Sequence, residues 1–322
     1  MIETTNLTNT AYDLERYRDA DDVRAFLRTF SLDGLEVMPW GENTLSFLPP
    51  DAVPGLHLGY FPCWVDFYRG QEEPVLREFG SMQAAYDRFG GETPEAIVEF
   101  FRRQMDFAES LHVKYVVFHV SDVSIRETVS YRFEHTDEEV IDASAEVLNR
   151  ATEGRSYSFE LLLENLWWPG FTFTRPEMTR RMLDGIGYPR TGIMLDVGHL
   201  MHTNLDLTGE RDGAAYVLRQ MDAHGALASR VRGLHMNFGA TGDAVRAMLR
   251  AGVPQDGDYW TRLGNAYEWI LKIDPHRPFE TPAAAALIRE IQPAYLTHEF
   301  ITESRAQHEA FLKTQRTAAH LA

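Results

Sequence analysis

Acidic and histidine side chains that could bind a metal ion follow short apolar runs of this chain. The stretch 191–205, TGIMLDVGHLMHTNL, shows this most clearly, because its apolar run 193–195 ends on Asp196 and His199 follows after a short turn. A buried strand carries apolar side chains on both faces, so a carboxylate is expected only where the strand ends and a pocket opens. We therefore expect Asp196 and His199 to face one cavity. The alternative is that Asp196 caps a following helix and His199 lies on the surface.

The same pattern recurs along the chain. The ionisable residues within or directly after short apolar runs are His57, His119, Glu164, Asp196, His235 and Glu299. Together they would be unstable in an apolar core, whereas a divalent cation would stabilise them, because carboxylates and neutral imidazoles are its usual ligands. The four that are hardest to explain as separate coincidences are Glu164, Asp196, His235 and Glu299. A lone His57 or His119 is more often a hydrogen-bonded core histidine than a ligand, and Glu36 could do no more than pair with an arginine.

Short apolar strands alternate with longer amphipathic segments, as in βα units around a parallel sheet. The strands that can be assigned lie at 35–38, 56–60, 114–120, 157–163, 193–195, 231–234 and 295–297. Helices are expected at 21–30, 93–110, 137–152, 175–186 and 260–273, and another from 281 onwards. The 64 residues from His235 to Glu299 leave room for two βα units. A further strand, without an assigned position, is therefore expected in this interval.

This alternation predicts an α/β fold, a (β/α)₈ barrel whose parallel strands all end at one mouth. Enzymes with this fold have their active sites at that C-terminal face. No linker rich in Pro, Gly or Ser interrupts the 322 residues, so we expect a single domain, 1–322. Long segments between strands, above all the aromatic and charged stretch that runs to about residue 91, predict elaborated loops at the C-terminal face.

Composition excludes several classes of protein. The 31 basic and 48 acidic residues give a net charge of −17, which argues against a protein that grips nucleic acid phosphates or an anionic membrane surface. The single Cys63 excludes an intrachain disulfide and a multi-cysteine metal site. The longest apolar runs have the length of strands, and the N-terminus lacks the pattern of a signal peptide. We expect a cytoplasmic protein with no membrane segment.

The chain resembles the xylose isomerase-like superfamily of TIM barrels, which includes sugar isomerases and epimerases, inosose dehydratases and endonuclease IV. The resemblance covers about residues 32–300, and its matching strings are FHVSD (118–122), LLLEN (161–165), GIMLDVGH (192–199), GLHMN (233–237) and LTHEF (296–300). It implies one divalent ion, Mn²⁺ in the first place and otherwise Mg²⁺, Co²⁺ or Zn²⁺. The metal ligands that it implies are Glu164, Asp196, His235 and Glu299. It also implies that His199 contacts the substrate, and that Glu164 and Glu299 act as acid and base on opposite faces of a sugar.

The endonuclease IV branch of this superfamily binds three zinc ions with additional histidines. His57, His119 and His199 match several of these. That branch also has an Asp-x-His ligand pair, which Asp274-Pro275-His276 spells, but this pair lies about 40 residues past His235. The acidic charge of the chain argues against this branch.

The implied ligand set predicts chemistry next to a carbonyl. A divalent ion that polarises the carbonyl of a ketose or keto-sugar acidifies the adjacent C–H, and a carboxylate removes the proton to give an enediolate. Return of the proton gives an isomerase or epimerase, whereas loss of a β-leaving group gives a dehydratase or lyase. A metal-dependent phosphodiesterase and a non-catalytic sugar-binding barrel are the rival classes.

Further residues at the expected mouth could contact a small-molecule sugar or sugar derivative. The substrate-binding candidates are His57, His119, Trp40, Trp167 and Asn237. Other aromatic residues expected nearby are Tyr60, Phe61, Trp64, Trp168, Phe171 and Phe238. They predict a platform for the apolar face of a sugar or for an attached aromatic group, although ordinary packing of long loops explains them equally well. Arg126, Arg132 and Arg175 could meet a phosphate. Such barrels commonly form oligomers, so a homo-oligomer is possible.

Overall fold

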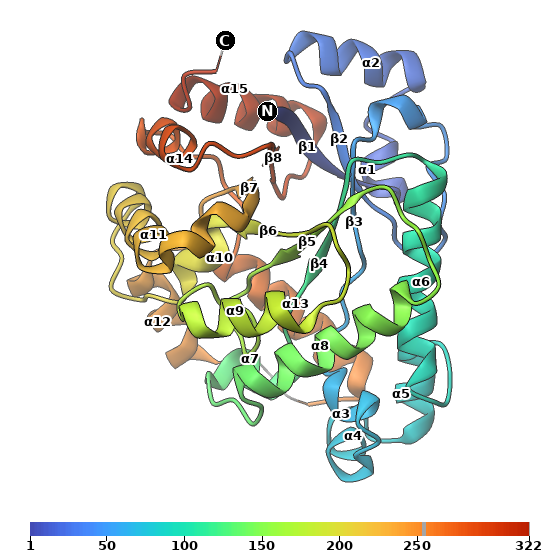
Figure 1. Cartoon of the computed structure of the whole chain (residues 1–322). Helices are drawn as coiled ribbons and strands as arrows, with labels where there is room; N and C mark the ends of the chain where they lie inside the picture. Colours follow the sequence, from blue (N-terminus) through green and yellow to red (C-terminus); the bar gives the residue numbers. More distant parts are fainter. Residues whose placement is uncertain (253–255, 322) are drawn as a thin grey trace.

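A closed barrel of parallel strands lies at the centre of the molecule (Figure 1). The computed structural model describes residues 1–252 and 256–321. The strands follow one another around the barrel in chain order, and β8 closes it against β1. Their bounds are β1 Ile2–Thr8, β2 Gly34–Met38, β3 Gly55–His57, β4 Tyr115–His119, β5 Glu160–Glu164, β6 Thr191–Asp196, β7 Val231–Met236 and β8 Tyr295–His298. The expected (β/α)₈ barrel is therefore confirmed.

Helices surround the barrel and elaborate its connections (Figure 1). Their bounds are α1 Ala11–Leu14, α2 Ala20–Thr29, α3 Val65–Tyr68, α4 Glu72–Phe79, α5 Met82–Phe89, α6 Glu95–Ser110, α7 Ile125–Ser130, α8 Asp137–Thr152, α9 Pro176–Gly185, α10 Val197–His202, α11 Glu210–His224, α12 Gly242–Ala251, α13 Tyr259–Ile273, α14 Ala283–Ile291 and α15 Arg305–Ala318, with 3₁₀ helices η1 Pro50–Ala52 and η2 Gly225–Arg230. None of the described helices combines the length and apolar character that a membrane span needs.

The start of helix α8 is determined by residues close to it in the sequence, and its bounds agree with those expected. The helix α8 begins where Thr136 caps it, because the Thr136 side chain accepts a hydrogen bond from the backbone of Glu139 while the Glu139 side chain accepts from the backbone of Thr136. This reciprocal capping box satisfies N–H groups that have no partner inside the helix. The observed bounds, Asp137–Thr152, are those expected from the sequence.

The eighth strand is at the N-terminus, so the expectation of an additional strand between His235 and Glu299 is wrong. Within its described residues, the interval between β7 and β8 forms α12, α13 and α14 and adds no strand to the barrel. The missing strand is β1, whose sequence IETTNLT has no apolar run. Glu3, Thr4 and Thr5 of this strand are buried, and other elements of the fold supply their hydrogen-bond partners. For example, Thr4 Oγ1 lies 2.9 Å from Thr297 Oγ1, and the Thr5 hydroxyl donates to the carbonyl of His298 at 2.8 Å.

Alternation along the strands positions ionisable side chains above an apolar layer. Residues two apart on a strand face the same side. A buried cluster made of Tyr115, Val117, Leu162, Met194 and Tyr295 comes from β4, β5, β6 and β8. Two residues further along three of these strands, on the same face, stand His119, Glu164 and Asp196. The barrel interior therefore changes from apolar to ionisable at the carboxyl ends of the strands.

Candidate metal centre

Four side chains with metal-binding atoms meet at the carboxyl ends of β5 to β8. They are Glu164, Asp196, His235 and Glu299, and their candidate ligand atoms all lie within 4.8 Å of one another. Glu164 and Asp196 end their strands, His235 is the last residue but one of β7, and Glu299 directly follows β8. All four are buried. Parallel strands of one barrel bring these residues together although 135 positions separate the first from the last (299 − 164).

Glu164 lies at the centre of the cluster, surrounded by imidazoles. Its Oε2 is 3.0 Å from His57 Nε2 and 3.1 Å from His119 Nε2. Its Oε1 is 3.2 Å from His235 Nδ1 and 3.4 Å from His199 Nδ1. Burial opposes ionisation, but His119 and His235 outweigh it and hold the pKa of Glu164 well below its usual range. Glu164 is therefore an ionised carboxylate that two groups of ligands could share.

The contacts of His235 indicate whether the four side chains are suited to bind a cation. Its Nε2 lies 3.0 Å from Glu36 Oε1, so this nitrogen carries the proton. Its Nδ1 faces three carboxylates, at 3.1 Å from Glu299, 3.2 Å from Glu164 and 3.9 Å from Asp196. One nitrogen cannot donate to three acceptors, whereas a lone pair on Nδ1 and three carboxylate oxygens together suit a divalent ion. The residues therefore fit the metal.

His57 and His199 repeat this arrangement. His57 Nδ1 lies 2.9 Å from the carbonyl of Leu58, and His199 Nδ1 lies 3.0 Å from that of Asn165, so each Nδ1 donates its proton. Each Nε2 then faces a carboxylate, at 3.0 Å from Glu164 and at 3.1 Å from Asp274 respectively. An imidazole nitrogen with a lone pair and a carboxylate oxygen are both acceptors. They can lie this close only if the imidazole carries a second proton or if a cation lies between them. The carboxylates raise the pKa of both histidines although burial opposes it.

Asp196 combines the two roles that the sequence left open. Its Oδ1 accepts a hydrogen bond from the backbone N–H of His199 at 2.6 Å and so caps α10, as the alternative supposed. Its Oδ2 accepts from Asn237 Nδ2 at 2.6 Å and faces the cluster. His199 is buried rather than on the surface. Burial raises the pKa of Asp196 to about 7, and the charges of Glu299 and Glu164 act in the same direction.

Three further groups of side chains adjoin the four. His57, His119 and Glu164 form one that could hold an ion, Asp196, His199 and His276 form a second, and Glu36, His57 and His235 form a third. Asp274 joins the second group, because its Oδ2 lies 3.1 Å from His199 Nε2 and 3.2 Å from His276 Nδ1. Burial opposes a charged His276, but Asp274 and Glu299 raise its pKa to about 10.

The sequence did not place Asp274 and His276 in the site because of their distance from His235. The structure shows why this distance misleads. The chain leaves the mouth after β7, forms α12 and α13, and returns at Asp274. The backbone of Phe238 then pairs with that of Arg277, which ties the returning segment to the start of the excursion. The Asp-x-His spelling was the signal that could have identified both residues.

The aromatic residues divide between the site and the packing around it. Tyr60 contacts the ring of His119 at 5.1 Å between centroids, and Trp167 contacts His199 at 5.3 Å and His202 at 4.9 Å. By contrast, Phe61 packs on Phe89, Phe100 and Phe101, Trp64 donates to the carbonyl of Ser121, and Phe171 packs on Phe173. Trp40 follows β2 and is exposed. Packing therefore explains several of these residues, and Tyr60 and Trp167 line the centre.

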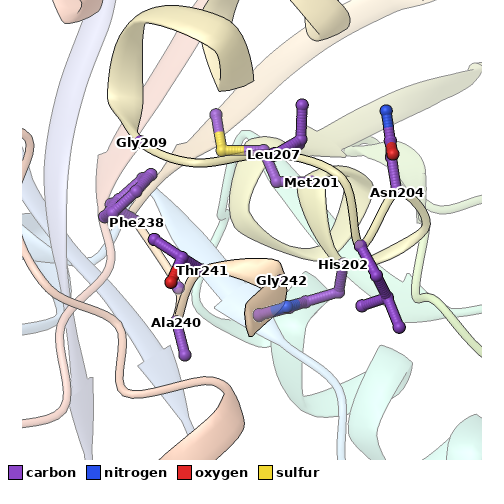
Figure 2. Close-up of a pocket in the computed structure, with 11 residues that line it drawn as sticks. Met201, His202, Asn204, Leu207, Gly209, Phe238, Ala240, Thr241 and Gly242 are labelled. Carbon is purple, nitrogen blue, oxygen red and sulfur yellow. The ribbon is translucent and has the colours of Figure 1, made fainter. Parts of the chain in front are cut away.

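A pocket beside the centre lies between the segment after α10 and the segment after β7 (Figure 2). It is lined by Met201, His202, Asn204, Leu205, Leu207, Gly209, Phe238, Gly239, Ala240, Thr241 and Gly242. His202 connects it to the centre, because His202 Nε2 lies 3.3 Å from Asp274 Oδ1. A Cβ on Gly239 would lie 2.3 Å from the same nitrogen, so only glycine fits there without displacing His202.

Comparisons with known proteins agree with this architecture. The family described as xylose isomerase-like TIM barrel matches residues 79–253, more than half of the chain. No curated protein sequence matches significantly. Among solved structures, endonuclease IV from Thermus thermophilus is 15% identical with a TM-score of 0.52 and full coverage of both chains. D-psicose 3-epimerase in the presence of D-fructose is 11% identical with a TM-score of 0.51, covering 99% of this chain and 97% of that one. The 3-keto-D-glucoside 4-epimerase YcjR from E. coli is 12% identical with a TM-score of 0.50 and 99% coverage of both chains.

Proposed function

The chain belongs to the xylose isomerase-like TIM-barrel family, and from this we propose that it is a divalent-metal-dependent isomerase or epimerase of a ketose or keto-sugar. The observation that carries the proposal is the buried cluster of three carboxylates and one imidazole at the carboxyl ends of β5 to β8. Two epimerases that act on sugars share the fold, although at such identities the likeness supports the fold alone. Loss of a β-leaving group from the same enediolate would instead make the enzyme a dehydratase or lyase.

The residues that would hold the ion are Glu164, Asp196, His235 and Glu299. A bound divalent ion, Mn²⁺ in the first place, would polarise the carbonyl of the sugar. Glu299 is held ionised, since His235 and His276 outweigh the effect of burial and keep its pKa well below the usual range. An ionised carboxylate at the rim can accept a proton from the substrate. His199 and Trp167 would contact the sugar, and Asn237 would hold Asp196 in place.

The overall charge of the chain favours a small sugar over nucleic acid. Two of the arginines that could meet a phosphate are already paired with acidic residues, Arg126 with Glu134 and Arg175 with Asp137. A net charge of −17 also opposes a polyanion. The rings of Tyr60 and Trp167 beside the histidines suit the apolar face of a sugar.

Phosphoester hydrolysis is the second candidate, and a specific observation favours it. His57 and His119 adjoin Glu164, while His199, Asp274 and His276 adjoin Asp196. These residues offer ligands for two ions beyond the one that an isomerase requires. Adjacent divalent ions are typical of phosphatases and nucleases. The substrate would then be a small phosphoester, for the electrostatic reasons given above.

Exchange of substrate protons with solvent distinguishes the two candidates. We expect the Mn²⁺-loaded protein to incorporate deuterium at the carbon next to the carbonyl when a ketose or a 3-keto-glucoside is incubated with it in D₂O, because proton abstraction precedes every outcome of the enediolate. Proton NMR of the recovered sugar measures this. Absence of exchange across a panel of keto-sugars, together with hydrolysis of bis-p-nitrophenyl phosphate and binding of about three ions per chain, would contradict the isomerase and support the phosphoesterase.

A further inference from the structure

Another buried carboxylate, Glu36, contacts the metal-centre histidine His235 and is not one of the four candidate ligands. It is the middle residue of β2 and is 1% exposed. Its Oε2 accepts hydrogen bonds from the hydroxyls of Tyr115 at 2.8 Å and of Thr297 at 2.9 Å. The alternative that Glu36 pairs with an arginine is wrong, because its partners in the described part of the chain are these hydroxyls and His235.

The contact between Glu36 and His235 involves one nitrogen of the imidazole, Nε2. The two hydroxyl groups donate to Oε2, and Oε1 lies 3.0 Å from His235 Nε2. A carboxylate oxygen accepts, so His235 donates from Nε2 and its Nδ1 is left with a lone pair. That lone pair points to the cluster of Glu164, Asp196 and Glu299. The ring of His57, stacked on that of His235 at 5.7 Å, packs against its face.

We propose that Glu36 is a positioning residue that fixes the tautomer and orientation of His235 and thereby sets the affinity of the centre for a divalent ion. The proposal rests on the metal site of the proposed function. A carboxylate that accepts the second N–H of a metal-binding histidine makes the ligand nitrogen more basic and holds the ring in place. Tyr115 and Thr297 hold Glu36 in turn, so hydroxyl groups from β4 and β8 contribute to the same geometry.

Two substitutions of Glu36 separate positioning from packing. Glu36→Leu introduces an apolar side chain of similar size that has no hydrogen-bond acceptor. Glu36→Gln keeps an acceptor oxygen but loses the charge. Calorimetric titration of the metal-free proteins with Mn²⁺ should show affinity falling by about 100-fold for Glu36→Leu and by about 10-fold for Glu36→Gln. Partial rescue by glutamine is the sign of a positioning role. Thermal melting of the metal-free proteins, measured in parallel, reports any loss of stability.

A matched pair elsewhere in the barrel supplies the control. Glu3 is another buried carboxylate that contacts a histidine, with Oε1 2.8 Å from His298 Nε2, but His298 is outside the cluster. We expect Glu3→Gln to lower the melting temperature and to leave Mn²⁺ affinity unchanged. Equal affinities for wild type and both Glu36 variants would overturn the proposal, and if Glu36→Leu does not fold, equal affinity of Glu36→Gln alone does so. Failure of the wild type to bind any divalent ion would instead overturn the proposed metal site.

The tautomer can also be observed directly. In the Zn²⁺-loaded protein, which is diamagnetic, long-range ¹H–¹⁵N spectra of the imidazoles should show the His235 proton on Nε2. The same spectrum of Glu36→Leu should show that assignment lost or exchanging between the two nitrogens. A His235 proton on Nδ1 in the wild type would contradict the proposed role of Glu36, whatever the affinity.

Discussion

Replacing Glu164 by glutamine is expected to weaken Mn²⁺ binding by at least about 100-fold and to lower kcat by about 10²–10⁴-fold. Glu164 contacts His57, His119, His199 and His235, each through a carboxylate oxygen within 3.4 Å of an imidazole nitrogen. The amide has nearly the same shape but lacks the charge, and its NH₂ group cannot bind a cation. Metal titration and initial rates at saturating Mn²⁺ measure the two effects.

The other end of the same strand offers the control for this substitution. Glu160 begins β5, pairs with Arg232 at 2.9 Å and accepts from the Tyr295 hydroxyl at 2.8 Å. Glu160→Gln should therefore alter stability slightly and leave Mn²⁺ affinity at the wild-type value. If Glu164→Gln bound Mn²⁺ as tightly as Glu160→Gln does, Glu164 would not be a ligand.

Replacing Gly198 by alanine is expected to lower both the stability of the protein and its affinity for metal. A Cβ at this position would lie 1.9 Å from Asn237 Oδ1 and 3.0 Å from Asn237 Cγ. Asn237 would have to move, and its 2.6 Å hydrogen bond to Asp196 Oδ2 would be lost. We expect a loss of about 1–3 kcal/mol in the free energy of unfolding from overpacking, and about 10-fold weaker Mn²⁺ binding because Asp196 is no longer held. Urea unfolding of the metal-free protein and Mn²⁺ titration measure these changes.

Gly264→Ala is the matched control for Gly198→Ala. Gly264 is exposed in α13, and no described atom beyond its own helix turn lies within 4 Å of the Cβ that alanine would add. Alanine is the better helix former, so this change should stabilise the protein by about 0.5–1 kcal/mol. A Gly198→Ala variant with the same sign and size of change would show that Asn237 does not need its present position.

The strands that contain a run of apolar residues could be predicted from the sequence. The strands that end on Glu164 and Asp196 were visible because three or more apolar residues precede each carboxylate. The strand β1 was missed because its buried polar side chains depend on partners such as Thr297 and His298, which lie about 290 residues away. A pattern along one strand cannot reveal a hydrogen bond that another strand supplies.

Some residues of the candidate site could likewise be predicted from the sequence, and others could not. Residues at strand ends could be assigned to one mouth because barrel topology fixes where parallel strands end. Asp274 and His276 belong to a returning loop, and their approach to His199 depends on how α12 and α13 fold. The contact between Glu36 and His235 joins β2 to β7 across the interior of the barrel. Neither relation can be derived from spacing in the chain.

Metal content tests the central claim most directly. Elemental analysis of the purified protein, beside Glu164→Gln and Glu299→Gln, should find at least about one divalent ion per chain in the wild type and clearly less in both variants, because each removes a carboxylate from the four-ligand cluster. About one ion would support the isomerase, and about three would support the phosphoesterase. A wild-type protein that retains no Mn²⁺, Mg²⁺, Co²⁺ or Zn²⁺, even after incubation with each ion, would contradict the account.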